Sequence, residues 1–331
     1  MRIYSLIPAA ALFLTGVGAA SGSECPVFDP APAAVCVASP HGLAYADTPG
    51  EAEVAARALA EAAQQYAGYF GRAPVGMLLL SADVDATQAN TFAASNDLEF
   101  ALVWVPAKAM RTMTERAMRQ AGLDRNRRRQ ALARADAQEA ITLRHEAGHA
   151  MYAAMFWPDA AGTREDRYGT PAPDWLDEAV AIAMEPPEAQ ARHLAAFIDV
   201  ARQRRREVPG FTDFLASEHP VRSVALARAL SRGPKSDSGV QMVVTSSGGF
   251  PGLETFYGQS LLTGLFLAET SGDPRILAPI SAAIAEGLDF GTWLARDGAR
   301  HNLPQTIQQL EPLWDTWLQE QVLRKAGNNA R

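Results

Sequence analysis

Apolar residues recur at helical spacing along most of this chain, and this pattern predicts a protein built mainly from helices. The first predicted helix is the alanine-rich segment Glu51–Tyr69, which should end at Gly71. The later helices are predicted at Ala107–Gln120, Arg128–Phe156, Trp175–Met184, Glu188–Arg206, Phe256–Thr270 and Leu310–Ala326.

Two early segments have the composition of β-strands instead. They are Pro74–Ser81, "PVGMLLLS", and Phe100–Ala107, "FALVWVPA", and a polar stretch separates them. Strands that precede a long helical region predict an α+β fold, mostly helical, with a small N-terminal sheet. The longest segment without a predicted element is Ser231–Gly252, and loops of that length are usually disordered or functional, such as a flap over a cleft.

Residues 1–20 are typical of a cleaved export signal. Arg2 provides a positive start, Ile3–Val17 is almost wholly apolar, and small residues follow. An uncleaved anchor is the alternative, but Pro8 and two glycines interrupt a run that barely reaches the roughly 20 residues of a spanning helix. We therefore expect a periplasmic or secreted protein without stable membrane insertion.

The two cysteines fit the same compartment. Cys25 and Cys36 lie just after the expected cleavage site, where an oxidising environment would let them pair, and two free thiols are the alternative. The chain then divides into the signal, an N-terminal segment at 21–50 and a main domain at 51–331. Within that domain we expect a helix and the small sheet at 51–110, followed by helices at 111–331.

Charge argues against one class of partner. The 331 residues are 48% hydrophobic and carry a formal net charge of −7. Two arginine-rich patches, Arg125–Gln130 and Arg202–Glu207, lie in polar, helix-forming contexts, and solvated helix faces explain them. We do not expect nucleic acid as a partner.

One ten-residue stretch carries candidate chemistry. "LRHEAGHAMY", from Leu143, places His145 and His149 about 40° apart on one helix face, so both imidazoles can reach one metal ion. Glu146 lies beside that face, where its carboxylate can take a proton from a water on the metal. Zinc lowers the pKa of such a water to roughly 7, which suits hydrolysis by a general base. The alternative is a pair of core histidines, which would need hydrogen-bond partners of their own.

A second stretch offers a third ligand. "PDWLDEAVAIAME", Pro173–Glu185, predicts a short helix that begins with Asp174 as its N-cap and stops at Pro186. A catalytic zinc usually takes three protein ligands, and Glu178, which is set among apolar residues, is the candidate for the third.

Together, "HEAGH" and the later "WLDEAVAIAME" resemble the gluzincin metallopeptidases, the group that contains thermolysin and aminopeptidase N. The resemblance implies that His145, His149 and Glu178 bind Zn²⁺ and that Glu146 is the general base. It covers roughly residues 51–321, but only the two zinc motifs are specific.

Further positions can be compared with the aminopeptidase N branch. Its second motif runs W-L-N-E-G-F-A and then reaches another glutamate; here Asp177 and Ala179 replace the Asn and Gly, and Glu185 is the counterpart of the later Glu. Glu185 then either orients a zinc ligand or lies on the surface. "FYGQSLLTGLFLAETSG", from Phe256, is similar to the helix that carries a zinc-facing tyrosine. This likeness implies that Tyr257 donates to the developing oxyanion, and a tyrosine packed on the core is the alternative.

Two features of the family are missing from the sequence. The G-x-M-E-N segment that holds a substrate's free amine is not found, so exopeptidase action is unsupported. The H-E-x-x-H-x-x-x-D continuation is also absent, so other acids must orient the histidines, and Asp174, Asp177 and Glu185 are candidates.

The leading hypothesis is an exported zinc metallopeptidase that acts on peptide or protein substrates. A non-catalytic envelope protein that retains the fold and its zinc is the alternative, and zinc-dependent hydrolysis of a non-peptide substrate would use the same residues. A structural zinc site is normally closed by four protein ligands, often cysteines, whereas both cysteines here lie more than a hundred residues before the histidines.

Overall fold

The computed structural model describes residues 25–29, 31, 34–120, 122–160, 170–220 and 252–328. Within these ranges the protein is mostly helical, with a small sheet near the N-terminus, so the expected α+β class is confirmed. The predicted export signal lies outside the described residues, and so does the predicted Ser231–Gly252 loop except for Gly252 itself.

The sheet has four strands in the order β1-β2-β3-β4. Strands β1 (Val35–Ser39) and β2 (Gly42–Ala46) form an antiparallel hairpin, and β2, β3 (Gly76–Leu80) and β4 (Phe100–Trp104) run parallel. Sequence analysis predicted β3 and β4 but not the first two strands. Their sequences, VCVAS and GLAYA, show neither a clear alternation of apolar and polar positions nor the run of large apolar residues found in β3, GMLLL.

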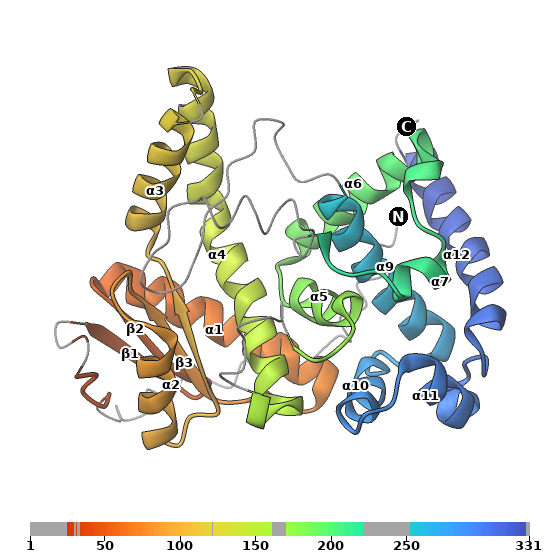
Figure 1. Cartoon of the computed structure of the whole chain (residues 1–331), viewed down its shortest axis with the longest axis horizontal. Helices are drawn as coiled ribbons and strands as arrows, with labels where there is room; N and C mark the ends of the chain where they lie inside the picture. Colours follow the sequence, from red (N-terminus) through yellow and green to blue (C-terminus); the bar gives the residue numbers. More distant parts are fainter. Residues whose placement is uncertain are drawn as a thin grey trace.

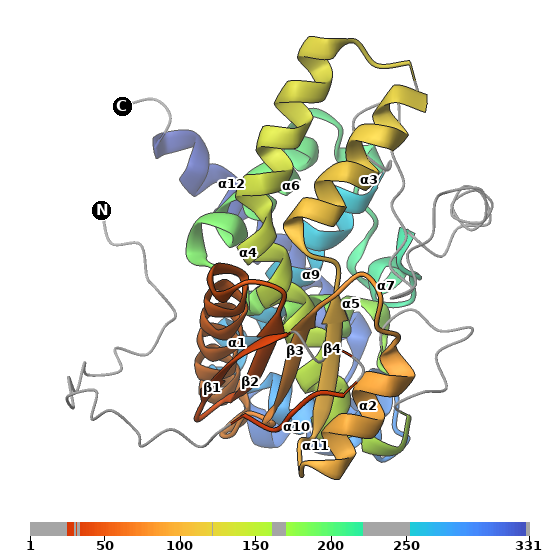
Figure 2. The same ribbon diagram turned by 90° about the vertical axis from the view of Figure 1, so that its left-hand side faces the viewer.

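Two helices connect the parallel strands and cover opposite faces of the sheet (Figures 1 and 2). Helix α1 (Pro49–Phe70) packs on the face that includes Leu78 and Leu80, and α2 (Ala86–Ser95) packs on the face that includes Met77 and Leu79. Because both faces of β3 are buried, its sequence is continuously apolar.

Helix α2 lies within the polar stretch between the two predicted strands, where no helix was predicted. Its start carries a capping box in which the Asp85 side chain accepts from the backbone N–H of Gln88, and the Gln88 side chain accepts from that of Asp85. This D-x-x-Q spacing is a helix-start signal that the polar composition concealed.

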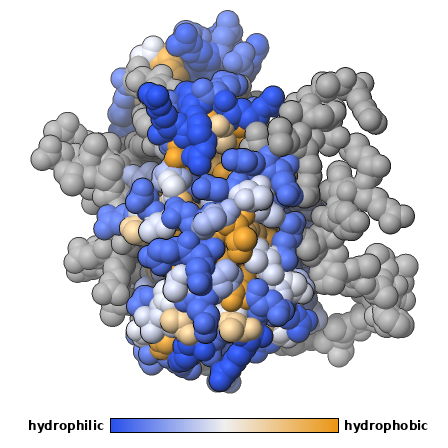
Figure 3. Space-filling view, turned by 90° about the vertical axis from the view of Figure 1, so that its right-hand side faces the viewer, coloured by the Kyte–Doolittle hydropathy of each residue, from blue (hydrophilic) through white to orange (hydrophobic). Residues whose placement is uncertain are grey.

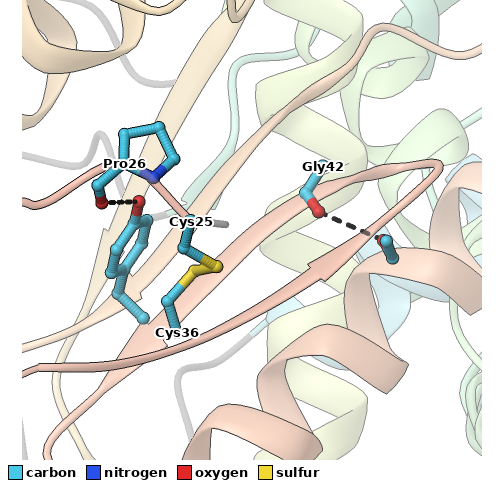
Figure 4. Close-up of a disulfide and its surroundings, with 6 residues drawn as sticks. Cys25, Pro26, Cys36 and Gly42 are labelled. Carbon is cyan, nitrogen blue, oxygen red and sulfur yellow. Dashed lines mark hydrogen bonds between the residues drawn. A yellow bond between two sulfur atoms is a disulfide. The ribbon is translucent and has the colours of Figure 1, made fainter. Parts of the chain in front are cut away.

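A disulfide attaches the N-terminal segment to the sheet. Cys25 is bonded to Cys36 of β1, which settles the choice between paired and free thiols (Figure 4). Nearby, the Tyr45 hydroxyl on β2 donates to the Pro26 carbonyl at 2.8 Å. At the other end of the hairpin, the Ser39 hydroxyl donates to the Gly42 carbonyl at 3.2 Å (Figure 4). The described residues of this N-terminal segment are thus held to the sheet by covalent and hydrogen bonds as well as by packing.

The remainder of the described chain is helical. Every predicted helix is present, with ends shifted by a few residues, and the unpredicted α7, α10 and α11 have five to nine residues each, which leaves little periodic pattern. The helices are α3 (Ala107–Gln120), α4 (Arg125–Phe156), α5 (Asp174–Ala183), α6 (Pro187–Gln203), α7 (Phe211–Leu215), α9 (Leu253–Ser271), α10 (Leu277–Ala285), α11 (Phe290–Asp297) and α12 (Ile307–Asn328). Short 3-10 turns lie at Pro158–Ala160, Arg205–Glu207 and Gly298–His301.

Helix α4 joins two different environments. Its N-terminal half pairs with α3 in a hairpin that projects from the body, whereas its C-terminal half lies among α1, α5 and α10 (Figures 1 and 2). Helix α9 then packs on α5 and α6. The motif at His145–His149 therefore lies where α4 enters the helical core.

The surface is polar over most of one broad face. On the side that carries α12, hydrophilic residues predominate, and the hydrophobic ones form a narrow strip (Figure 3). The apolar core below it extends from α1 to Trp314 and Leu318 of α12. No helix in the described part of the chain is both long and apolar enough to cross a membrane.

Candidate metal centre

Three predicted ligands meet between α4 and α5. His145, His149 and Glu178 each offer one ligand atom within 4.8 Å of the others, and all three side chains are buried. The two histidine Nε2 atoms are 3.2 Å apart, and the Glu178 carboxylate oxygens lie 3.5 and 3.6 Å from them. Donor atoms about 2.1 Å from a tetrahedral metal ion lie about 3.4 Å from one another, so these separations fit such an ion.

Close packing of the two helices sets this distance. Gly148, between the two histidines, faces α5, and a Cβ there would lie 2.9 Å from both Ala181 Cα and Met184 Cγ. Arg144 holds the same pair of helices together, because its Nε donates to the Met184 carbonyl at 2.7 Å. Its guanidinium also pairs with Glu61 of α1 at 2.9 Å. The absence of a side chain at Gly148 and the hydrogen bond of Arg144 therefore allow Glu178, the candidate third ligand, to lie close to the histidines.

Each histidine is oriented by a buried carboxylate. The Nδ1 atoms of His145 and His149 lie 2.9 Å from Glu185 Oε1 and Asp177 Oδ1, respectively. Because a carboxylate only accepts, each Nδ1 carries the proton, and each Nε2 is left to face Glu178. Asp177 is itself held by the Thr170 N–H at 2.8 Å. Of the two alternatives for Glu185, the structure shows the buried, orienting one.

The third candidate acid has a different role. Asp174 was expected to cap α5, but it is the first residue of that helix, and Pro173 at the N-cap position makes no side-chain hydrogen bond. Its carboxylate instead accepts from the backbone N–H of His219 at 2.7 Å. Asp174 thus fixes the segment that follows α7.

Two further histidines join the cluster, and sequence analysis missed both. His219 is 1% exposed, and its Nε2 lies 3.5 Å from Glu178 Oε1. His193 on α6 has its Nε2 3.0 Å from Glu185 Oε2, so Glu185 accepts from two histidines. Each is an isolated histidine in the sequence, and the only available signal was that the chain has just six.

Tyr257 and Glu146 both lie beside the cluster. The Tyr257 ring, on α9, is centred 6.0 Å from the ring of His145 and 5.6 Å from those of His193 and His219. Glu146 is half-buried on α4 between the two histidines. The structure therefore places both predicted catalytic residues next to the ligands, and their roles stay predictions.

Electrostatics favour a cation at this point. Burial raises the pKa of Glu178, and the charges of Asp177 and Glu146 raise it further, while the two histidines lower it. Neither Glu178 oxygen has a hydrogen-bond partner in the described part of the chain, and the residue is 0% exposed. A buried carboxylate without a hydrogen bond is costly, and a divalent ion held with two imidazoles would compensate it.

Burial and neighbouring groups also have opposing effects on the pKa values of His149 and Glu185. Burial lowers the pKa of His149, but the charges of Asp177 and Glu178 outweigh it and raise that pKa to about 10. Burial acts to raise the pKa of Glu185, but hydrogen bonds from His145 and His193 lower it to about 2. Without a metal, protons on the imidazoles balance the carboxylates, so a metal ion would compete with those protons.

No protein-family model, curated protein or solved structure matches this chain. The likeness to gluzincins therefore rests on the motif residues and on the buried His-His-Glu group that they form, which is compatible with a metal site.

Proposed function

We propose that the protein is an exported zinc metallopeptidase that hydrolyses peptide bonds. The observation that carries the proposal is the buried donor set of two imidazole nitrogens and one carboxylate whose oxygens have no hydrogen-bond partner in the described part of the chain. Zinc favours nitrogen and carboxylate donors, and three protein ligands are typical of catalytic rather than structural zinc sites.

The side chains around this donor set can divide the chemistry among them. A zinc ion bound there would act as a Lewis acid on the scissile carbonyl and on water. Glu146 takes a proton from the attacking water and passes it to the leaving amine. Tyr257 donates its phenolic hydrogen to the developing oxyanion. Asp177 and Glu185 keep the two imidazoles in one tautomer and one orientation throughout.

A zinc-binding protein without turnover is the second candidate, and His219 supplies the observation for it. Its Nε2 lies 3.5 Å from Glu178, close enough that a modest ring movement could add a fourth ligand. Four protein ligands would close the site and leave no place for substrate.

The Glu146→Gln variant distinguishes the two candidates. If Glu146 is the general base, the variant keeps about one zinc per chain but loses peptide hydrolysis by about 100-fold or more, because amide nitrogen cannot take the proton. Cleavage of a mixture of fluorogenic peptides and elemental analysis measure these two quantities. The exposed Glu53 on α1 provides the matched control, and Glu53→Gln should change neither.

Two outcomes would contradict the proposal. Hydrolysis by Glu146→Gln at the wild-type rate would show that Glu146 is not the general base. A wild-type protein that holds zinc and cleaves none of the peptides would favour the second candidate.

A further inference from the structure

Charge is distributed very unevenly between two parts of the molecule. Residues 107–130, which form α3 and the start of α4, have a net charge of +6, although the whole chain has −7. The rest of the chain therefore carries −13. The charged residues of this segment, here called the basic hairpin, are Lys108, Arg111, Arg116, Arg119, Arg125, Arg127, Arg128 and Arg129, against Glu115 and Asp124.

The basic hairpin is also the part that projects furthest from the body on its side of the molecule (Figures 1 and 2). Arg116, Arg119, Arg125, Arg127 and Arg129 are exposed. Its two acids pair with Arg119 and Arg127 in exposed ion pairs, which leaves an excess of positive charge around the tip. Exposed ion pairs contribute little to stability, so this charge pattern is not explained by folding alone.

We propose that the basic hairpin docks the protein on an anionic, phosphate-bearing lipid surface. Seven of its eight basic residues are arginines, whose planar guanidinium groups match phosphate oxygens two at a time. A convex tip fits a flat array of headgroups better than it fits a pocketed partner. Met118, on α3, is buried, so contact occurs through charge rather than by inserting this side chain.

The acidic body does not cancel this attraction. From Arg125 to His145 the chain runs in one helix, α4, so the hairpin tip lies about 30 Å from the metal centre at 1.5 Å per residue. Charges are screened over about 8 Å at physiological salt, so the tip acts largely alone. Docking would place the metal centre at a fixed height above the lipid surface. The inference concerns a separate part of the molecule and holds whether or not that centre is catalytic.

Vesicle sedimentation tests the proposal with the folded, disulfide-bonded protein. It should bind vesicles that contain phosphatidylglycerol, fail to bind vesicles of phosphatidylcholine alone, and dissociate at high salt. Arg125→Gln, Arg127→Gln and Arg129→Gln together should weaken binding about 100-fold, since each charge near such a surface contributes roughly five-fold. Circular dichroism and thermal unfolding would verify that the variant remains folded.

The second arginine-rich patch provides a matched control. Arg202, Arg204 and Arg206 are exposed at the end of α6 and beyond it, and replacing these three by Gln removes the same charge elsewhere. Binding by this variant should equal that of the wild type. Equal loss in both variants would show a response to total charge and would overturn the proposal, as would no vesicle binding at physiological salt.

Two other polyanions complete the test. Hairpin-dependent binding to a mixed-sequence DNA duplex that is tighter than vesicle binding would mean a nucleic-acid site instead. The same result with poly-glutamate would mean an acidic protein partner. Either result would overturn the assignment to lipid.

Discussion

The sheet and the metal centre bury side chains of opposite kinds. In β3, Met77 and Leu79 contact one apolar cluster and Leu78 and Leu80 the other, and none of these side chains requires a particular partner. Around Glu178, by contrast, each of two buried histidines lies between the Glu178 carboxylate and a second carboxylate. The free energy gained by burying apolar side chains is roughly proportional to the buried area and does not depend on direction. Each buried charge, by contrast, needs a counter-charge at a fixed place.

This difference determines what each region contributes. The sheet, with α1 and α2 on its faces, stabilises the fold whatever ions are present. The metal centre costs free energy to assemble, because Glu178 is buried without a hydrogen-bond partner among the described residues. The fold therefore supports the site, and a bound cation would repay part of that cost.

The strongest test of this contrast is to remove a ligand. Zinc should raise the unfolding temperature of the wild type, since a ligand at a thousand times its Kd stabilises the folded state by about 4 kcal/mol. His149→Ala should abolish that rise and leave the protein with no tightly bound zinc. Calorimetry with and without zinc, together with elemental analysis, measures both. His41→Ala, in the β1–β2 turn, should respond to zinc like the wild type, and a zinc response retained by His149→Ala would refute the site.

A core substitution in the sheet should show the reverse behaviour. Leu78 is 0% exposed, and Leu78→Ala should lower the free energy of unfolding by about 2–5 kcal/mol through lost contacts and a cavity. The stabilisation by zinc should remain close to that of the wild type, because the hydrogen bonds and ion pairs that position the candidate ligands join α4 to α5 and to Glu185 and do not involve β3. Urea unfolding with and without zinc measures both values. If the zinc effect disappeared as well, the two regions could not be treated as separate.

The three candidate ligands could be named from the sequence because local patterns mark each of them. His145 and His149 share a helix face by spacing alone, and Glu178 follows from a short helix with a recognisable motif. His193 and His219 come from elements that only tertiary packing brings to Glu185 and Glu178. No local pattern marks such residues, so the sequence could not predict them.

The elements of the fold were likewise predictable where a local sequence pattern marks them. Long periodic helices such as α4 were found, because their pattern repeats over many turns. Strands β1 and β2 were missed because neither has a clear apolar pattern, and the pairing of β2 with β3 joins segments distant in sequence. Helix α2 had a local signal, its capping box at Asp85 and Gln88, which composition outweighed in our prediction.

The smallest expected effect concerns a glycine whose role was invisible in the sequence. Glycine inside a helix normally costs about 1 kcal/mol relative to alanine, yet Gly148 lies within the C-terminal half of α4. The close approach of Ala181 explains it, and Gly148→Ala should force α5 and its candidate ligand Glu178 outward. We expect a loss of about 1–3 kcal/mol in unfolding free energy, and a smaller stabilisation by zinc than in the wild type.

Gly68 in α1 is the matched control, because an added Cβ would meet nothing within 4 Å. Gly68→Ala should leave the zinc response unchanged and make the protein more stable by up to about 1 kcal/mol, since alanine favours the helix. The two variants make the same chemical change, so their difference isolates the contact between α4 and α5. If Gly148→Ala matched Gly68→Ala in both stability and zinc response, close helix packing would not be what brings the carboxylate to the histidines.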